Sequence, residues 1–147
     1  MGPGPSITIT QTEGYRFAVD FGGVLPLLAV DEAVPIGNGE GPFPEQLLVS
    51  AVANCLCASL VFALGKYKQE GGGIRAEAHC AVARNAENRL RITGITVSIS
   101  LGATADAVPR IDRVLEQFQR FCTVSESVQA GIPVTVSVRD GAGTLLT

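Results

Sequence analysis

The sequence predicts a single α+β domain over residues 1–147. Three observations support this prediction: apolar and polar residues alternate in several segments, a long apolar run lies between them, and apolar residues recur at helical spacing from Asp106 to Phe121. Hydrophobic residues make up 46 % of the chain and charged residues 17 %, which is typical of a folded protein with a sizeable core.

The charge pattern argues against a nucleic-acid partner. The formal net charge of -3 comes from interspersed acids and bases, with no basic cluster that would neutralise phosphates. The start, Met1 to Ser6, lacks the positive flank and apolar stretch of a secretory signal, so we expect a cytoplasmic protein with reduced thiols. The four cysteines are then candidates for chemistry, metal binding or core packing.

The first elements are expected to be strands. Residues alternate over Ser6–Thr12 and again over Tyr15–Phe21, with Gly14 as the turn between them. A third, short strand is expected over Leu25–Val30. The segment Asp31–Pro44 is rich in glycine and proline and predicts a long irregular loop.

A long helix should follow, beginning at Pro44-Glu45 and ending near Lys68 before three glycines. Its apolar residues are found all round the helical wheel, so it should be buried on nearly all sides. A domain of this size has little material to cover such a helix. We therefore expect a homodimer in which a second copy covers the rest of it.

The run from Leu47 to Leu64 also has about the minimum length of a membrane span and carries no charge. Ser50, Asn54 and Ser59 within it, and strand-like segments on both sides, favour a core helix and no membrane contact.

A hairpin is predicted next. Ile74–Arg84 alternates, with Ile74, Ala76, Ala78, Cys80 and Val82 inward and Arg75, Glu77 and His79 outward. Asn85–Asn88 makes the turn. The apolar phase changes near Gly94 in the returning strand, which predicts a β-bulge there.

The last elements are two helices and a strand. An amphipathic helix is expected over Asp106–Phe121, with Glu116 and Arg120 paired on its exposed face. Thr123 and Glu126 have the spacing of a capping box, which starts a short helix just after Cys122. Ile132–Val138 alternates as a final strand.

Neither a metal nor a cofactor is expected. Cys55 and Cys57 point about 200° apart on a helix, so they do not face one site, and one of them must be a packing residue. The spacing is C-x-C, the only histidine is His79, and its strand phase directs it away from Cys80.

A reactive thiol needs a nearby cation, because an ordinary thiol with a pKa near 8.5 is only a few per cent ionised at neutral pH. Cys55 lies about three turns into its helix, where the helix dipole contributes little. Arg16, in the middle of a strand beside aromatic residues, is the candidate cation; an ordinary charge at a sheet edge is the alternative.

Three groups of residues resemble the OsmC/Ohr family of peroxide-reducing proteins. They are Pro44-Glu45-Gln46-Leu47-Leu48, then Ala53-Asn54-Cys55 with Ser59-Leu60, and Phe121-Cys122-Thr123-Val124-Ser125. The order of elements is similar over almost the whole chain. The resemblance implies an intertwined α+β homodimer with a long central helix, antiparallel sheets and sites at the interface.

The resemblance also implies the chemistry. Cys55 would be the thiol that attacks an organic hydroperoxide, Cys122 the thiol that resolves the sulfenic acid, and a dithiol, for example of lipoyl type, the reductant. Glu45 would hold Arg16, and Arg16 would hold the thiolate and the leaving oxygen.

Three departures from the family pattern leave an alternative open. Thr123 replaces a proline that often follows the second cysteine, Phe43 replaces an asparagine, and Cys57 is an extra thiol. The alternative is a non-catalytic module that binds a small apolar or sulfur-containing ligand at the dimer interface.

Overall fold

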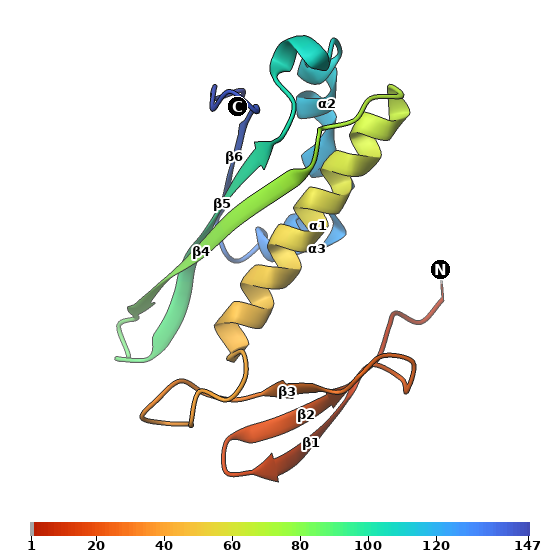
Figure 1. Cartoon of the computed structure of the whole chain (residues 1–147). Coiled ribbons are helices and arrows are strands. Elements are labelled where there is room, and N and C mark those ends of the chain that lie inside the picture. Colours follow the sequence, from red (N-terminus) through yellow and green to blue (C-terminus); the bar gives the residue numbers. More distant parts are fainter. Residues whose placement is uncertain (1) are drawn as a thin grey trace. The chain divides into compact units, whose positions relative to one another are not determined.

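The computed structural model describes residues 2–147 and has the elements of an α+β fold (Figure 1). The chain divides into two compact units, Met1–Leu48 and Val49–Thr147, and each is described by itself. That the two form one domain stays a prediction.

The first unit contains a three-stranded antiparallel sheet in the order β1-β2-β3. Its strands are β1 (Thr8–Glu13), β2 (Arg16–Asp20) and β3 (Leu28–Val30). The turn at Gly14, which has a φ of 54°, joins the first two as expected. β3 is shorter than predicted. Pro26, within the predicted strand, has no N–H to donate to a neighbouring strand.

A buried carboxylate organises the predicted loop after β3. Asp31 is 3 % exposed and accepts hydrogen bonds from the backbone N–H groups of Glu32, Asn38 and Glu40 at 2.8, 3.1 and 3.1 Å. These hydrogen bonds hold the pKa of Asp31 below its usual value, and the bond from Glu40 has the largest effect. A Cβ at Gly37 would collide with the Asp31 carboxylate, so glycine is required there.

The long helix is α1 (Pro44–Lys66), close to its predicted bounds. Its length and its mean hydropathy of 2.3 over the most apolar window would also suit a membrane span. Core helices of soluble proteins meet the same test. One face of α1 is buried in the chain, and its buried residues are Val52, Leu56, Ser59, Leu60, Ala63 and Leu64.

The second unit contains a sheet in the order β4-β5-β6 (Figure 1). The predicted hairpin is confirmed as β4 (Ile74–Arg84) paired with β5 (Leu90–Leu101). The predicted bulge is confirmed too: Ala81 pairs with Gly94 and Val82 with Ile92, which leaves one extra residue in β5. Arg75 and Glu77 are exposed, as expected, and pair at 2.7 Å.

The inward face predicted for β4 is only partly confirmed. Ile74, Ala76 and Cys80 are half-buried, whereas Ala78 is exposed. Val82 lies at the bulge, where the strand loses its regular register, and is also exposed. The buried face of the hairpin is contributed mainly by β5, through Ile95, Val97, Ile99 and Leu101.

The expectation of antiparallel sheets does not hold for the last strand. β6 (Val134–Arg139) runs parallel to β5, with Ile95 opposite Val134. Parallel neighbours need a crossover connection. Here the helical segment from Ala105 to Val128 supplies the crossover, and it returns the chain to the end of the sheet where β5 began.

The predicted helix over Asp106–Phe121 is in fact three pieces: η1 (Ala105–Ala107), α2 (Ile111–Gln117) and η2 (Phe118–Phe121). Proline disfavours helical geometry in the residue before it, and Val108, before Pro109, has φ -127° and ψ 78°. The α-helix therefore begins only after Pro109.

The expected pair of Glu116 with Arg120 is wrong. Arg113 contacts Glu116 instead, at 3.3 Å. The α-helical spacing that would pair Glu116 with Arg120 ends at Gln117, where the 3-10 turn begins.

Candidate active site

Cys55 lies in the middle of α1 and is half-buried. It immediately precedes Leu56, one of the fully buried residues of the core. Core packing on the Leu56 face of the helix fixes the direction in which the Cys55 side chain leaves it.

Cys122 is fully buried and is the N-cap residue of α3 (Thr123–Val128). Its Sγ accepts a hydrogen bond from the backbone N–H of Ser125 at 3.3 Å. An N-cap side chain normally satisfies one of the free N–H groups of the first turn, and here the sulfur does so. Helix capping therefore holds the sulfur of Cys122 in one place.

The predicted capping box is wrong by one residue. Thr123 is already helical, and the cap is Cys122. The carboxylate of Glu126 accepts a hydrogen bond from the Gln129 side chain at 2.6 Å instead of reaching back to the cap. Because Cys122 has the extended backbone of a cap, the helix begins directly after it.

The thiols of Cys55 and Cys122 are neighbours in the second unit, close enough for Cys55 to affect the pKa of Cys122. Burial raises the pKa of Cys122, and a side-chain hydrogen bond with Cys55 raises it further, while the bonds from Ser125 act in the opposite direction. All four cysteines are free thiols. The structure thus brings two of the predicted site residues near one another, and the raised pKa keeps the Cys122 thiol protonated at neutral pH.

Arg16 and Glu45 lie in the first unit, whereas both cysteines lie in the second. The resemblance implied that Glu45 would hold Arg16, but within this unit Arg16 pairs with other carboxylates. Its guanidinium forms ion pairs with Glu40, and with Glu13 at 3.1 Å. The Asp31-anchored loop presents Glu40, and a neighbouring strand residue presents Glu13, so two carboxylates already surround the cation.

Glu45 is half-buried in the first turn of α1, where the helix dipole stabilises a negative charge. The roles of Arg16 and Glu45 beside Cys55 stay predictions.

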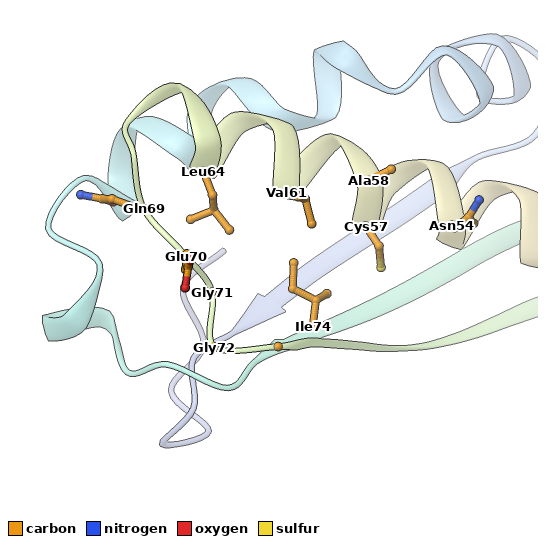
Figure 2. Close-up of a pocket in the computed structure, with 11 residues that line it drawn as sticks. Asn54, Cys57, Ala58, Val61, Leu64, Gln69, Glu70, Gly71, Gly72 and Ile74 are labelled. Atoms are coloured by element: carbon orange, nitrogen blue, oxygen red, sulfur yellow. The ribbon is translucent and has the colours of Figure 1, made fainter.

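A pocket lies on another side of α1. It has a volume of about 760 Å³ and is lined by Asn54, Cys57, Ala58, Val61, Leu64, Gln69, Glu70, Gly71, Gly72, Gly73 and Ile74. Figure 2 shows Cys57, Val61 and Leu64 directed from the helix and Ile74 from β4 toward the same space. Neither Cys55 nor Cys122 lines it. As the helical wheel predicted, Cys55 and Cys57 do not face the same site.

Cys57 is half-buried in this pocket, and burial raises the pKa of its thiol. It is therefore a poorer nucleophile than an ordinary thiol at neutral pH. Among residues 2–147, no three His, Cys, Asp or Glu side chains gather in a way that would hold a metal ion.

Two elements of these sites were missed by sequence reasoning. The partner Glu40 lies in an irregular loop, and no periodic pattern indicates where such a residue points. The pocket depends on the three glycines at 71–73 and the polar residues before them, which the sequence showed only as the end of a helix.

Comparison with known proteins agrees with this fold. The sequence model of the family described as OsmC-like protein matches residues 37–137. No curated protein sequence matches the chain significantly.

Solved structures match over nearly the full length. An OsmC-like protein from Mycoplasma pneumoniae has a TM-score of 0.80 at 13 % identity, over 95 % of this chain and 99 % of that one. An organic hydroperoxide resistance protein from Elizabethkingia anophelis has a TM-score of 0.74 at 16 % identity, over 95 % of this chain and 99 % of that one.

The organic hydroperoxide resistance protein OhrB of Bacillus subtilis has a TM-score of 0.68 at 15 % identity, over 91 % of this chain and 98 % of that one. Identities this low establish likeness of fold. Together with the family match over more than half of the chain, they lead to one conclusion: this protein belongs to the OsmC-like family.

Proposed function

We propose that this protein is a cysteine-based peroxidase that reduces organic hydroperoxides. The observation that carries the proposal is the proximity of the Cys55 and Cys122 thiols, one on a long helix and one capping a short helix. Relatives of this fold named as organic hydroperoxide resistance proteins support the substrate class.

In the first step, the Cys55 thiolate attacks the terminal oxygen of the hydroperoxide. A sulfur–oxygen bond forms and the oxygen–oxygen bond breaks, so that Cys55 is oxidised to a sulfenic acid. The alkoxide leaving group takes up a proton and departs as an alcohol. Cys122, whose raised pKa keeps it protonated, does not compete for the peroxide at neutral pH.

In the second step, the sulfur of Cys122 attacks that of Cys55. A disulfide forms, the sulfur–oxygen bond breaks, and the hydroxide leaves with the proton of the Cys122 thiol as water. A dithiol reductant, for example of lipoyl type, then returns both cysteines to thiols and becomes a cyclic disulfide itself.

The cation in this scheme is Arg16, held by a carboxylate. Glu45 is the partner that the family resemblance implies, whereas Glu40 and Glu13 are the partners that Arg16 contacts within its unit. The proposed role requires the guanidinium to face the Cys55 thiolate in the working protein, with Glu45 orienting it.

The working protein is proposed to be a cytoplasmic homodimer. α1 leaves an apolar strip exposed in one chain, including Val61 at 58 %. The first sheet also exposes Ile9 at 53 %. Exposed apolar surface of this extent is typical of a protein interface, and a second copy would cover it.

Steady-state reduction of cumene hydroperoxide by the full chain with dihydrolipoamide tests the proposal. We expect Cys55→Ser to abolish consumption and Cys57→Ser to leave it within about twofold, since Cys57 faces a different pocket. We also expect a larger kcat/KM for cumene hydroperoxide than for hydrogen peroxide. The proposal would be rejected if the unsubstituted protein and Cys55→Ser both consumed the hydroperoxide no faster than the reaction without protein.

The pocket beside Cys57 favours a second candidate, a module that binds a small apolar or sulfur-containing ligand. Its volume of about 760 Å³ is in the range of small-molecule sites, and Ala58, Val61, Leu64 and Ile74 give it an apolar lining. Cys55→Ser separates the two functions. Peroxide consumption would be lost, whereas binding of an apolar fluorescent probe in the pocket would be retained and would weaken on Ala58→Asp.

A further inference from the structure

Two aromatic rings and a lysine connect α1 to the turn before Cys122. The rings of Phe62 and Phe121 meet edge to face, with centroids 5.1 Å apart and planes at 83°. The Nζ of Lys66 lies 4.5 Å from the Phe121 centroid and 5.4 Å from the Phe62 centroid. We call these three residues the Lys66 cluster. One ammonium in it contacts both rings.

The cluster and Cys55 lie on the same side of α1. Cys55, Ser59, Phe62 and Lys66 follow at spacings of four, three and four residues, which places them on one face of a helix. Phe121 directly precedes Cys122 and is the last residue of η2. This face of α1 therefore contacts the residue before Cys122 through the Lys66 cluster, and it carries Cys55, the neighbour of the Cys122 thiol.

The contacts of the cluster matter because burial does little to fix these rings. Phe62 is 55 % exposed and Phe121 is 37 % exposed, in contrast to the fully buried Phe118 at the start of the same turn. A cation–π contact or an edge-to-face pair at such a site changes an equilibrium by about twofold to fivefold. The ammonium of Lys66 takes part in two such contacts.

We propose that Lys66 is a positioning residue for disulfide closure, which holds the η2 turn on α1 so that Cys122 stays within reach of Cys55. This proposal rests on the proposed function for its peroxide step, although closure can also be driven by another oxidant. Lys66 does not touch the reacting sulfurs. It acts through Phe121, the residue next to Cys122.

A chemical competition makes the role measurable. Once Cys55 is a sulfenic acid, either Cys122 closes the disulfide and releases water, or a second hydroperoxide oxidises the sulfenic acid to a sulfinic acid and leaves as an alcohol. A slower closure therefore increases the sulfinic acid formed per turnover. A residue that only stabilised the fold would not change this ratio in protein that remains folded.

The test uses the full chain in four forms: unsubstituted, Lys66→Gln, Lys66→Arg and the matched control Lys68→Gln, which removes the same charge two residues away. Reduced protein is mixed with cumene hydroperoxide, quenched at intervals and mapped by mass spectrometry. We expect Lys66→Gln to slow closure of the Cys55 to Cys122 disulfide about threefold to tenfold, with the rate of peroxide attack unchanged.

The ratio of sulfinic acid to disulfide should rise by a similar factor in Lys66→Gln. Lys66→Arg should restore closure, because a guanidinium also stacks on aromatic rings, and Lys68→Gln should match the unsubstituted protein. Phe62→Leu, which removes one ring of the cluster, should shift the ratio in the same direction as Lys66→Gln.

A parallel series with diamide separates the two proposals. Diamide oxidises a pair of thiols to a disulfide and is itself reduced to a hydrazine, with no peroxide chemistry. Slower diamide-driven closure in Lys66→Gln, together with no peroxide consumption by any form, would reject the proposed function and keep the positioning role. Equal closure in unsubstituted protein and Lys66→Gln with both oxidants would overturn the role of Lys66.

Discussion

The thiol of Cys122 is fully buried, and the neighbouring thiol of Cys55 helps to raise its pKa, although the two residues belong to elements of different kinds. Cys55 lies in the middle of the long helix α1, and Cys122 caps the short helix α3. The cap bond from Ser125 at 3.3 Å lowers the pKa of this thiol, whereas Cys55 raises it. Any change at Cys122 therefore affects both the local fold and the thiol pair.

Substitution of Cys122 should separate capping from chemistry. Cys122→Ala removes the acceptor for the Ser125 N–H, and we expect it to lower the free energy of unfolding by about 1 kcal/mol. Cys122→Ser keeps an acceptor at the cap and should lose less. Urea unfolding of the reduced proteins measures both; equal stability of the two variants would mean that the cap bond contributes nothing.

The raised pKa of Cys122 predicts a loss of stability at alkaline pH. An unfolded thiol ionises near pH 8.5, and the buried one ionises at a higher pH. The stabilising effect is therefore complete below about pH 8.5 and is lost as the pH rises through the pKa of the folded state. Under reducing conditions, unsubstituted protein should lose more stability between pH 7 and 10 than Cys122→Ser does. Parallel curves would contradict the assignment.

Sequence reasoning was most successful where a short pattern determines the local structure. The β4–β5 hairpin and its bulge at Gly94 followed from strict alternation and one change of phase. The ends of α1 followed from Pro44 and the glycines after it. In each case the relevant neighbours are close in sequence, so the pattern contains the information.

The wrong predictions concern features that depend on contacts between residues or on competing side chains, which a short sequence pattern does not show. The parallel pairing of β6 depends on which end of the sheet the crossover reaches. Arg16 pairs with Glu40 because Asp31 folds the intervening loop back on itself. The capping box at Thr123 matched a spacing rule, but the sulfur one residue earlier was the better-placed acceptor.

Asp140, which directly follows β6, should make the stability of the fold sensitive to acid. Its carboxylate is 6 % exposed and accepts hydrogen bonds from the backbone N–H groups of Ala105, Ala142 and Thr144 at 3.0, 3.0 and 2.8 Å. These hydrogen bonds lower the pKa of Asp140. The stabilisation is present above the unfolded pKa of about 3.9 and is lost as the pH falls through the folded value.

Asp140→Asn should therefore reduce stability at pH 7 and flatten its decline below about pH 4. Asp112→Asn, at an exposed acid of α2, is the control. Thermal unfolding between pH 2.5 and 7 measures both effects. A decline as steep in Asp140→Asn as in unsubstituted protein would show that another group causes it.

The exposed strip of α1 predicts the oligomeric state. We expect a dimer in analytical ultracentrifugation, and Val61→Asp, which puts a charge on the 58 % exposed position, should shift it toward monomer by at least tenfold in Kd. Leu145→Asp, at a similarly exposed residue near the C-terminus, is the control. An unsubstituted protein that stays monomeric at high concentration would contradict the expected dimer.

The most direct test is a stoichiometric titration of the fully reduced protein with cumene hydroperoxide, followed by thiol counting and peptide mapping. The account predicts that each equivalent of peroxide removes two thiols and produces one disulfide, between Cys55 and Cys122, until all of that pair is oxidised. Peroxide left unconsumed, or thiols lost from Cys57 or Cys80 while Cys55 and Cys122 remain reduced, would contradict it.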